Sequence, residues 1–494
     1  MHRIAIIGGG PGGLFTTYLL QRKVANALAI TIFEANDRIG GKILTKQFST
    51  APIRYEAGAA ELYLYSKVGH DPLHHLVRTL GLPTMSLYGQ TVVMGDRIMR
   101  TTQDIRRHFG RQTLKEIKRF QAFGKSHVSP MEYYDAGWPD DNRHVLTTRS
   151  FETVLAGIRD EMALRYVKVA VHSDLACEPH QVSGLFGIQN TLLTDTNYVQ
   201  LYSIRGGLER LTQGLAQQLR ARVQLNCPVV GVQKSTRDGY DVFYQDGNQT
   251  ASETFDALVF ALPICWLPTI EWRDRKLHRA MQDHHAYYSN PAHYLRITLL
   301  FQRPFWRHLL VDSYFQLDAF GGCCVYDEGA KQEAEPYGVL SWLVAGTHAM
   351  LNGNLDDRTL VRKALESLPA ALSEGRQLVL EGRVDRWVGA VTAPAPGRQI
   401  RGAKIRHSPE PRDHPRLFVV GDYLFDATIN GTLDSAEIVS DLVSRSVRRS
   451  NGHFTRSTFN AAETRQANGG GWPETGTTHG EPAIAQRSLN DASR

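Results

Sequence analysis

The sequence predicts an α/β protein in which a discontinuous Rossmann-like dinucleotide-binding domain accompanies an α+β substrate domain. Three observations predict this class: a glycine-rich turn between a strand and a helix at 8–13, and similar strand–helix blocks near residues 206 and 421. The chain of 494 residues exceeds the roughly 100–200 residues of one domain, so we expect two or three domains.

The first unit starts almost at the beginning of the sequence. Residues 3–7 form a continuous apolar run, as expected for a strand that is buried on both faces. The glycine-rich turn leads into a helical pattern over 14–20, and a second apolar run over 28–33 ends in Glu34. This order of strand, turn, helix and strand predicts the βαβ unit of a dinucleotide site.

The spacing of the glycines indicates how the turn binds a pyrophosphate. Gly8 permits the tight turn, Gly10 lets the backbone approach the phosphates, and Gly13 lets helix and strand pack closely. The helix N-terminus adds N–H donors and the positive end of its dipole. Glu34 follows the second strand, where it accepts hydrogen bonds from ribose hydroxyls, which favours an adenosine without a 2′-phosphate.

Two further blocks contain the same kinds of element. In the first, Gly206-Gly207 opens a helix with leucines at helical spacing, and two Asp-Gly turns separate alternating segments. These segments predict a small antiparallel meander, which a buried strand over 256–263 closes. In the second block, a strand over 416–420 precedes Gly421-Asp422 and another helix.

These blocks and the stretches between them predict the domain boundaries. The dinucleotide-binding domain comprises 1–85, 198–265 and 395–448, and the substrate domain comprises 86–197 and 266–394. The remaining residues 449–494 are polar, rich in Gly and Thr and without periodicity, so we expect a disordered tail.

Composition argues against several other classes of protein. Hydrophobic residues make up 42% and charged residues 21%, as in ordinary globular proteins, and the net charge of +6 comes without a basic stripe for nucleic acid. No apolar run reaches the ~20 residues of a membrane span, and no secretory signal precedes the first strand, so we expect a cytoplasmic protein. The five cysteines and the histidines lack metal-ligand spacing, so we expect no metal, and Cys323 and Cys324 should be reduced thiols.

Four segments of the chain resemble the flavin-dependent amine oxidase family, which includes monoamine, polyamine and L-amino-acid oxidases. Residues 34–42 (EANDRIGGK) are similar to the family's E-x-x-x-R-x-G-G-R run, with Lys42 in place of the last arginine. Residues 56–61 are similar to its D/E-x-G-A segment, and 203–207 to its G-G-x-x-x-L helix start. Gly421-Asp422 with 430–436 is similar to its C-terminal motif.

The resemblance implies that FAD is the cofactor. It implies that 56–61 runs beside the isoalloxazine ring, that the backbone of Val229 meets the adenine, and that Asp422 holds the region between pyrophosphate and ribityl. A helix N-terminus then points at the N1–C2=O edge of the flavin, where it stabilises the negative charge of the reduced ring. The predicted cofactor contacts are Gly8, Gly10, Pro11, Gly13, Glu34, Ala35, Gly41, Lys42, Gly58, Ala59, Val229, Gly421, Asp422, Thr432 and Leu433.

The chain departs from the family pattern around the expected flavin. The stretch 387–397, which holds the flavin-linking cysteine in monoamine oxidases, contains no cysteine, so we expect non-covalent FAD. The two positions of the family's aromatic cage fall on Ala390 and Thr432. Trp387 or Tyr423 would then supply an aromatic side chain in place of the cage. Alternatively, Trp387 is an aromatic residue that packs in the core.

Two charged residues stand at positions that the family uses for other chemistry. Arg296 replaces a lysine near flavin N5, and strand periodicity places it with Tyr294 and Thr298 on one face, which lines a wet cavity or faces solvent. Arginine is a poor proton acceptor but a good anchor for a carboxylate. Glu61 replaces the carboxylate-binding arginine of L-amino-acid oxidases, so it holds an ammonium or guanidinium group, or else contacts the cofactor. Arg296, Glu61 and Trp387 are the candidate catalytic residues.

The expected activity is that of an FAD-dependent oxidoreductase of the amine-oxidase type. It oxidises a C–N bond of an amine or amino acid to an imine by hydride transfer to flavin N5, with O₂ as the acceptor that yields H₂O₂. Two alternatives stay open: a desaturase or isomerase acting on a non-amine substrate, and a flavoprotein with a structural FAD. The expected partners are a small-molecule substrate and O₂, without nucleic acid or membrane, and a homodimer is left open.

Overall fold

The computed structural model describes residues 1–24, 27–65, 69–135, 145–332, 334–398 and 401–450, which belong to one compact unit. The tail predicted for 449–494 lies outside the described residues except for Arg449 and Ser450, which end a helix. Among the helices that the structure describes, none is long and apolar enough to cross a membrane.

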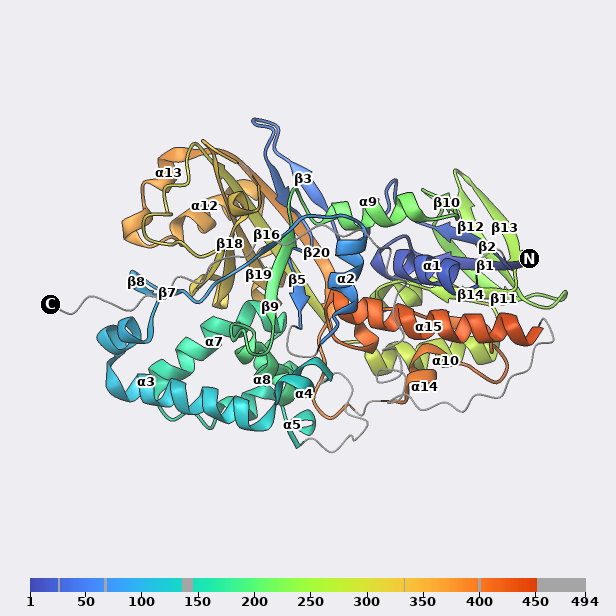
Figure 1. Ribbon diagram of the computed structural model, residues 1–494, viewed down its shortest axis with the longest axis horizontal. Helices are drawn as coiled ribbons and strands as arrows, with labels where there is room; N and C mark the ends of the chain where they lie inside the picture. Colours follow the sequence, from blue (N-terminus) through green and yellow to red (C-terminus); the bar gives the residue numbers. More distant parts are fainter. Residues whose placement is uncertain (25–26, 66–68, 136–144, 333, 399–400, 451–494) are drawn as a thin grey trace, which may run out of the picture. The chain divides into compact units, whose positions relative to one another are not determined.

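A five-stranded parallel sheet forms the first half of the fold (Figure 1). Its central strand, β1 (His2–Ile7), pairs with β2 (Leu28–Phe33) on one side and with β14 (Ala257–Phe260) on the other. The edge strands are β10 (Arg222–Gln224) and β21 (Leu417–Val419). The sheet therefore joins three segments that lie far apart in the sequence.

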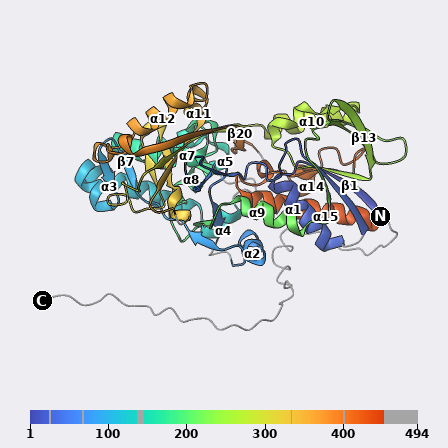
Figure 2. The same ribbon diagram turned by 90° about the horizontal axis from the view of Figure 1, so that it is seen from above.

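Apolar residues cover both faces of this sheet, which explains why its strands have continuous apolar sequences. Ile4 and Ile6 of β1 pack with the helices α1 (Pro11–Val24), α9 (Glu209–Gln218) and α15 (Ile429–Ser450). Ala5 and Ile7 pack toward the opposite layer. Figure 2 shows the layers on the two sides of this sheet from above. The opposite layer contains α10 (Arg275–Tyr288) and a sheet of β13 (Gln249–Phe255), β12 (Tyr240–Asp246), β11 (Val229–Lys234) and β15 (Glu271–Trp272).

A seven-stranded sheet forms the second half of the fold. Its strand order is β20 (Val379–Thr392), β16 (Pro291–Phe301), β19 (Gly338–Ala345), β18 (Cys323–Asp327), β17 (Tyr314–Leu317), β7 (Val92–Met94) and β8 (Arg97–Met99). Only β17 and β7 pair in parallel. The longest pair, β16 with β20, runs antiparallel from Pro291 to Phe301.

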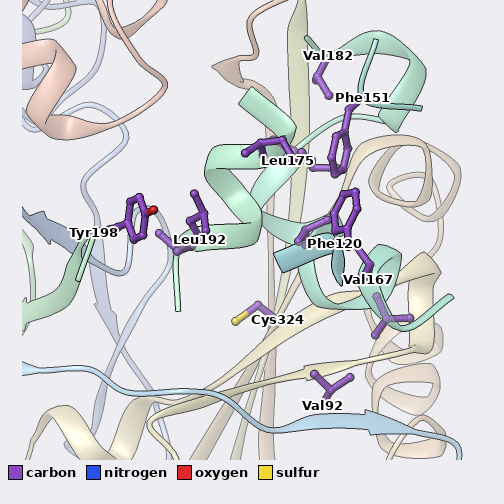
Figure 3. Close-up of a cluster of buried hydrophobic side chains, with 14 of the residues drawn as sticks. Val92, Phe120, Phe151, Val167, Leu175, Val182, Leu192, Tyr198 and Cys324 are labelled. Atoms are coloured by element: carbon purple, nitrogen blue, oxygen red, sulfur yellow. The ribbon is translucent and has the colours of Figure 1, made fainter. Parts of the chain in front are cut away.

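Each face of the seven-stranded sheet packs on helices. Leu295, Ile297 and Leu299 of β16 face α12 (Asp357–Glu366), which confirms the predicted alternation along this strand. The opposite face packs on α3 (Thr102–His127), α7 (Glu161–Leu175) and α8 (Gly184–Leu192). Figure 3 shows the apolar cluster between these helices and the sheet, with Leu175 and Cys324 facing the same core.

Shorter elements connect the two sheets. They are β3 (Thr45–Gln47) paired with β4 (Arg54–Glu56), and β5 (Leu62–Leu64) and β6 (Thr84–Ser86) on either side of β9 (Gln200–Ile204). The remaining helices are α2 (Pro72–Thr79), α4 (Pro130–Asp135), α5 (Val145–Thr148), α6 (Phe151–Leu155), α11 (Gly346–Asn352), α13 (Gly375–Leu378) and α14 (Ala403–His407). The α/β class and the βαβ unit at the start of the chain are confirmed.

Candidate active site

The glycine-rich turn after β1 is packed on one side and open on the other. Gly8 has a φ of +108°, and a Cβ there would collide with the carbonyl of Ala261. A Cβ at Gly13 would collide with the carbonyl oxygen of Gly8, so helix α1 packs directly on the turn. A Cβ at Gly10, in contrast, would meet only the Cα of Gly41, at 3.7 Å. Gly10 therefore leaves the backbone of the turn accessible to a ligand.

A second glycine turn and Glu34 hold this loop in place. The Gly40 N–H donates to the carbonyl of Gly9 over 2.8 Å, so the run that begins at Glu34 returns to the first loop. Glu34 is buried, and its Oε2 accepts from the Gly9 N–H over 2.7 Å. Its Oε1 accepts from the backbone N–H of Asn36 over 2.9 Å. Oε2 keeps acceptor capacity for a further hydroxyl, because a carboxylate oxygen accepts two hydrogen bonds.

The first turns of α1 and α15 meet at the carboxyl end of the sheet. A Cβ at Gly12 would lie 3.0 Å from Val420, which follows β21, and 3.5 Å from Thr432 in the first turns of α15. Leu433, the next residue of α15, is buried. Both helices therefore bring free N–H groups and positive dipole ends to one place, which suits a bound anion.

The charges of Lys42 and Asp422 influence each other near these helix ends. The Lys42 Nζ donates to the carbonyl of Gly389 over 2.9 Å and to that of Ala390. Burial lowers the pKa of the Lys42 ammonium, and the nearby charge of Asp422 opposes this shift. Burial likewise raises the pKa of the Asp422 carboxyl, with Lys42 opposing. Asp422 is half-buried, so part of its side chain stays accessible.

The adenine end of the predicted site lies where β2 and β11 adjoin. The N–H of Cys227 donates to the carbonyl of Glu34 over 2.9 Å, and the N–H of Asn226 donates to that of Asn36 over 2.9 Å. These bonds bring Val229, the first residue of β11, to the same edge as Glu34, while Ala35 between them is exposed. The open turn, the paired helix ends and this edge together fit an adenine dinucleotide, for which Gly8, Gly10, Gly13 and Glu34 are the predicted contacts.

The segment 56–61 lies between the Lys42 run and β20. Ala59 donates its N–H to the carbonyl of Lys42 over 3.1 Å, and a Cβ at Gly58 would collide with that same carbonyl. On the other side, the indole N–H of Trp387 donates to the carbonyl of Ala57 over 2.6 Å. Trp387 is half-buried and borders this segment.

Tyr423, the other aromatic candidate, belongs to a separate packed cluster. Its ring lies 5.9 Å from that of His284 and 5.8 Å from that of Tyr288, centroid to centroid. Ala390 is buried, and the Thr432 hydroxyl donates to the carbonyl of Thr428 over 3.0 Å. Of the two aromatic candidates, Trp387 is therefore the one that hydrogen-bonds to the segment 56–61.

Arg296 is buried in an ion cluster rather than facing solvent. Only 1% of its surface is exposed, and its Nη1 lies 3.1 Å from Oε1 of Glu328. The other oxygen of Glu328 lies 3.0 Å from Nζ of Lys331. Nη1 of Arg296 also donates to the carbonyl of Glu56 over 3.0 Å. The solvent-facing alternative is therefore wrong, because a guanidinium without access to water needs the carboxylate that Glu328 provides.

Glu61 approaches this cluster from the other side. Its Oε2 accepts from the hydroxyl of Tyr326 over 3.0 Å, and burial is the largest cause that raises its pKa. Arg296 and Lys331 lie 5.2 and 5.1 Å from the centroid of the Tyr326 ring, respectively. Sequence reasoning missed Tyr326, Glu328 and Lys331. The available signal was a charged pair directly after the apolar strand at 323–326.

All five cysteines are unpaired. Cys323 and Cys324 face opposite sides of the seven-stranded sheet, since they belong to different apolar clusters. Cys265 lies against Gly389, where an added Cβ would be 2.7 Å from its sulfur. No cluster of three or more His, Cys, Asp or Glu side chains that could hold a metal occurs in the part of the chain that the structure describes.

The chain has relatives of two kinds among known proteins. Prenylcysteine oxidase 1 of Pongo abelii is 22% identical over 293 residues, which cover 53% of this chain and 56% of the relative. The Homo sapiens protein is 23% identical over 295 residues, with the same coverage. The chain thus spans just over half the length of these relatives.

Solved structures match over most of the chain. A putrescine oxidase bound to putrescine has a TM-score of 0.67 at 19% identity, over 92% of this chain and 99% of the other. Cyclohexylamine oxidase from Brevibacterium oxydans has a TM-score of 0.69 at 17% identity, over 91% and 100%. These likenesses confirm the amine-oxidase type of fold.

The family model for flavin containing amine oxidoreductases matches residues 11–444, which include the first helix, the segment 56–61 and most of α15. The matched region contains the residues whose geometry fits an adenine dinucleotide, apart from the first turn of the glycine loop. The chain therefore belongs to the flavin-containing amine oxidoreductase family.

Proposed function

We propose that the protein oxidises a C–N bond of an amine or amino acid to an imine and passes the electrons to O₂. When bound, FAD supplies the electron acceptor, which takes a hydride at N5 from the carbon next to the amine nitrogen. The substrate loses that hydride and one proton from nitrogen, O₂ takes up two electrons and two protons as H₂O₂, and water hydrolyses the imine. The use of O₂, a homodimer and a cytoplasmic location stay predictions.

The meeting of two helix N-termini at an open glycine turn is the observation that carries this proposal. The contact between Gly12 and Thr432 joins the ends of α1 and α15, while Gly10 leaves room for a ligand. Helix N-termini stabilise negative charge, both on a pyrophosphate and on a flavin that gains charge on reduction. Gly421 and Asp422 complete this wall, and Glu34 and Val229 mark its adenine end.

The substrate side of the site is proposed to lie beside 56–61. Trp387 of β20 hydrogen-bonds to this segment, and Glu61 is its last residue. Arg296 is proposed as a positioning residue, because its Nη1 fixes the carbonyl of Glu56 and its charge is already paired with Glu328. Its free capacity for a substrate carboxylate is therefore small, which favours an amine over an amino acid.

We also propose the division into two domains. Its support is that every strand of the five-stranded sheet falls in 1–85, 198–265 or 395–448. Every strand of the seven-stranded sheet falls in 86–197 or 266–394. Each group of segments thus builds one sheet, and 56–61 lies between them.

A panel of substrates tests the proposed activity. Purified protein loaded with FAD is mixed with primary amines and amino acids, and peroxide release and loss of the oxidised-flavin absorbance under anaerobic conditions are measured. We expect at least one primary amine to reduce the flavin and to release peroxide when O₂ is admitted. Flavin that no amine or amino acid reduces would refute the proposal.

A second candidate is a desaturase or isomerase acting on a substrate without an amine. It is favoured by Ala390 and Thr432, which supply no aromatic side chain at the family's cage positions. Flavin that is photoreduced and rapidly reoxidised by O₂, yet is inert toward every amine, would favour this candidate. Flavin that is inert in both experiments would indicate a structural cofactor.

Non-covalent attachment of FAD is part of the proposal. Its support is the lack of cysteine in 387–397, while Cys265 is the cysteine that lies against Gly389. Acid precipitation should release all flavin into the supernatant. If flavin stays with the protein, loss of that retention in Cys265→Ala would identify the attachment site.

A further inference from the structure

A cavity beside Asp422 has no part in the proposed reaction. It has a volume of about 80 Å³, well above the ~10–15 Å³ that one water molecule needs. Its walls come from α5, α8, α10 and α14, from the end of β20 and from the segment that leads from β21 to α15. Neither Trp387 nor any residue of 56–61 lines this cavity, so it is separate from the proposed substrate side.

Two arginines on the wall of this cavity have aromatic neighbours. The guanidinium carbon of Arg398 lies 5.8 Å from the centroid of the Tyr288 ring, and that of Arg401 lies 3.6 Å from the centroid of the Tyr287 ring. Within the described part of the chain, no carboxylate forms an ion pair with either arginine. Burial lowers the pKa of the Arg398 guanidinium, and the groups that oppose this shift are the two tyrosines. A guanidinium that lies over a ring uses its face, so its N–H edge can bind an anion.

A third arginine reaches the same cavity from α14. Arg406 is buried, and its Nη1 donates to the carbonyl of Leu424 over 3.0 Å. Its guanidinium carbon lies 5.3 Å from the centroid of the Phe425 ring. Burial raises the pKa of the Tyr288 hydroxyl to about 12, and the charges of all three arginines oppose this shift. The three cations therefore lie close to one hydroxyl on the cavity wall.

Two tyrosine hydroxyls at the cavity have no hydrogen-bond partner among the residues that the structure describes. Tyr288 is 4% and Tyr423 is 6% exposed, and both side chains line the cavity. Their ring centroids lie 5.8 Å apart. Buried hydroxyls are nearly always hydrogen-bonded, so this pair of donors indicates a bound group that has oxygen acceptors.

The two acidic residues on the cavity wall interact with other groups. Oδ1 of Asp426 accepts from the N–H of Thr428 over 3.2 Å and from the hydroxyl of the same residue. Burial raises the pKa of the Asp422 carboxyl, and the charge of Lys42 opposes this shift. Neither carboxyl is among the groups that shift the pKa of Arg398. The guanidinium of Arg398 is therefore available to a ligand.

We propose that this cavity binds an oxyanion group, a phosphate or a carboxylate, of a small molecule other than FAD. Arg398, Arg401 and Arg406 supply the positive charge, and a forked guanidinium binds either group through two N–H bonds. The hydroxyls of Tyr288 and Tyr423 supply further donors, which the oxygens of such a group accept. The stacked rings hold the arginines in place, so little side-chain freedom is lost on binding.

The cavity adjoins the predicted cofactor site without coinciding with it. Of the predicted FAD contacts, only Asp422 also lines the cavity. An anion bound here therefore lies beside FAD rather than in place of its phosphates. The inference is independent of the proposed oxidation, since it concerns binding rather than turnover.

Equilibrium dialysis of FAD-loaded protein tests the proposal, with radiolabelled inorganic phosphate and radiolabelled acetate measured separately. Arg398→Gln removes one cation, and Tyr288→Phe removes one hydroxyl without a partner. Arg279→Gln removes an exposed arginine from α10, the helix that contains Tyr288, and is the matched control. Flavin content and thermal unfolding confirm that each variant is folded.

The parent protein should bind a single phosphate or acetate per chain. The Kd for the tighter-binding anion should rise roughly tenfold or more in Arg398→Gln and about threefold in Tyr288→Phe, because the first variant loses an ion pair and the second a hydrogen bond. Arg279→Gln should bind the anion as the parent does. Without anion, Tyr288→Phe should unfold at no lower temperature than the parent, because its hydroxyl has no partner to lose.

The relative affinities identify the ligand. Tighter binding of phosphate indicates a phosphate-bearing molecule and tighter binding of acetate a carboxylate-bearing one, and either result supports the site. Binding of neither anion, binding that Arg398→Gln and Tyr288→Phe leave unchanged, or a lower unfolding temperature of anion-free Tyr288→Phe would overturn the inference.

FAD titration of the apoproteins tests whether the oxyanion belongs to the cofactor. Arg398→Gln should bind FAD with the affinity of the parent protein. If this variant loses FAD affinity roughly tenfold or more, the arginines bind the phosphates of FAD itself and the inference is wrong. The amine oxidase proposal is unaffected by either result, since peroxide release with amines tests it separately.

Discussion

Glu328 neutralises two cations at once in the interior, and this cluster determines what Arg296 can do. Each of its carboxylate oxygens lies about one hydrogen-bond length from a different cation, 3.1 Å from Arg296 and 3.0 Å from Lys331. Removing one member of a buried ion pair leaves an uncompensated charge that typically costs ~3–5 kcal/mol. Such a cluster has a structural role first, so a mutation at Arg296 has to be judged by folding before activity.

Glu56 makes stability depend on pH. Burial raises its pKa to about 7 from its usual value near 4.5, although Lys331, the Leu208 N–H and the Thr45 hydroxyl oppose the shift. The folded protein therefore holds the proton more tightly than the unfolded chain, and this contribution to stability is complete below about pH 4.5 and is lost as the pH rises through 7. In thermal scans, the unfolding temperature of the parent protein should therefore decrease between pH 5 and pH 7.5 by more than that of Glu56→Gln. Parallel pH profiles for the two proteins would contradict this assignment.

Single residues differ in how far the sequence reveals them. The roles proposed for Gly8, Gly10 and Gly13 follow from spacing, because one short turn contains all of them. The partner of Arg296 could not be found in this way, since Glu328 lies 32 positions away and meets it only when distant strands assemble.

The contact between the first turns of α1 and α15 is the element-level feature on which FAD binding depends. Gly10 lies beside this contact and leaves space there, because a Cβ added at Gly10 would be 3.7 Å from its nearest atom, the Cα of Gly41. Gly10→Ala should therefore fold normally but lose FAD affinity, by roughly tenfold or more, because the methyl group occupies the path of the pyrophosphate. Gly214→Ala is the matched control, since its Cβ would also have free space, 3.8 Å from Leu80, but on α9.

Flavin fluorescence titration measures the two affinities, and circular dichroism compares the folded apoproteins. If both variants bind FAD as the parent does, Gly10 is not at the pyrophosphate. If Gly10→Ala fails to fold, the turn is less open than the distances indicate.

Elements with a local pattern were predicted well, and elements paired over long distances were not. The apolar runs at 3–7 and 28–33 correspond closely to β1 and β2, because burial on both faces gives an uninterrupted apolar sequence. The seven-stranded sheet was not predicted as a sheet, because β7 pairs with β17 more than 200 positions later. Only the alternation along β16 showed its two faces in advance.

For the whole molecule, FAD binding should stabilise one half of the fold more than the other. The proposed contacts lie on the five-stranded sheet and its helices, so removal of FAD takes support from 1–85, 198–265 and 395–448. At an FAD concentration 100 times its Kd the gain is about 2.7 kcal/mol. Hydrogen–deuterium exchange should speed up mainly in those segments of the apoprotein, apart from Trp387 and its neighbours on β20. Uniform loss of protection, or loss centred on β16–β19, would count against the proposed domain division.

The meeting of α1 and α15 also sets when a newly made chain can capture its cofactor. The ribosome releases β1 and α1 early, but β21 begins at Leu417 and α15 at Ile429. At roughly 5–20 residues per second, synthesis takes on the order of 20–80 s to supply that last wall. During this interval the edge of β14 that β21 later covers is exposed to other strands, which makes the nascent chain vulnerable to mispairing. Flavin capture is thus a late event of biosynthesis, whatever the supply of the vitamin in the cell.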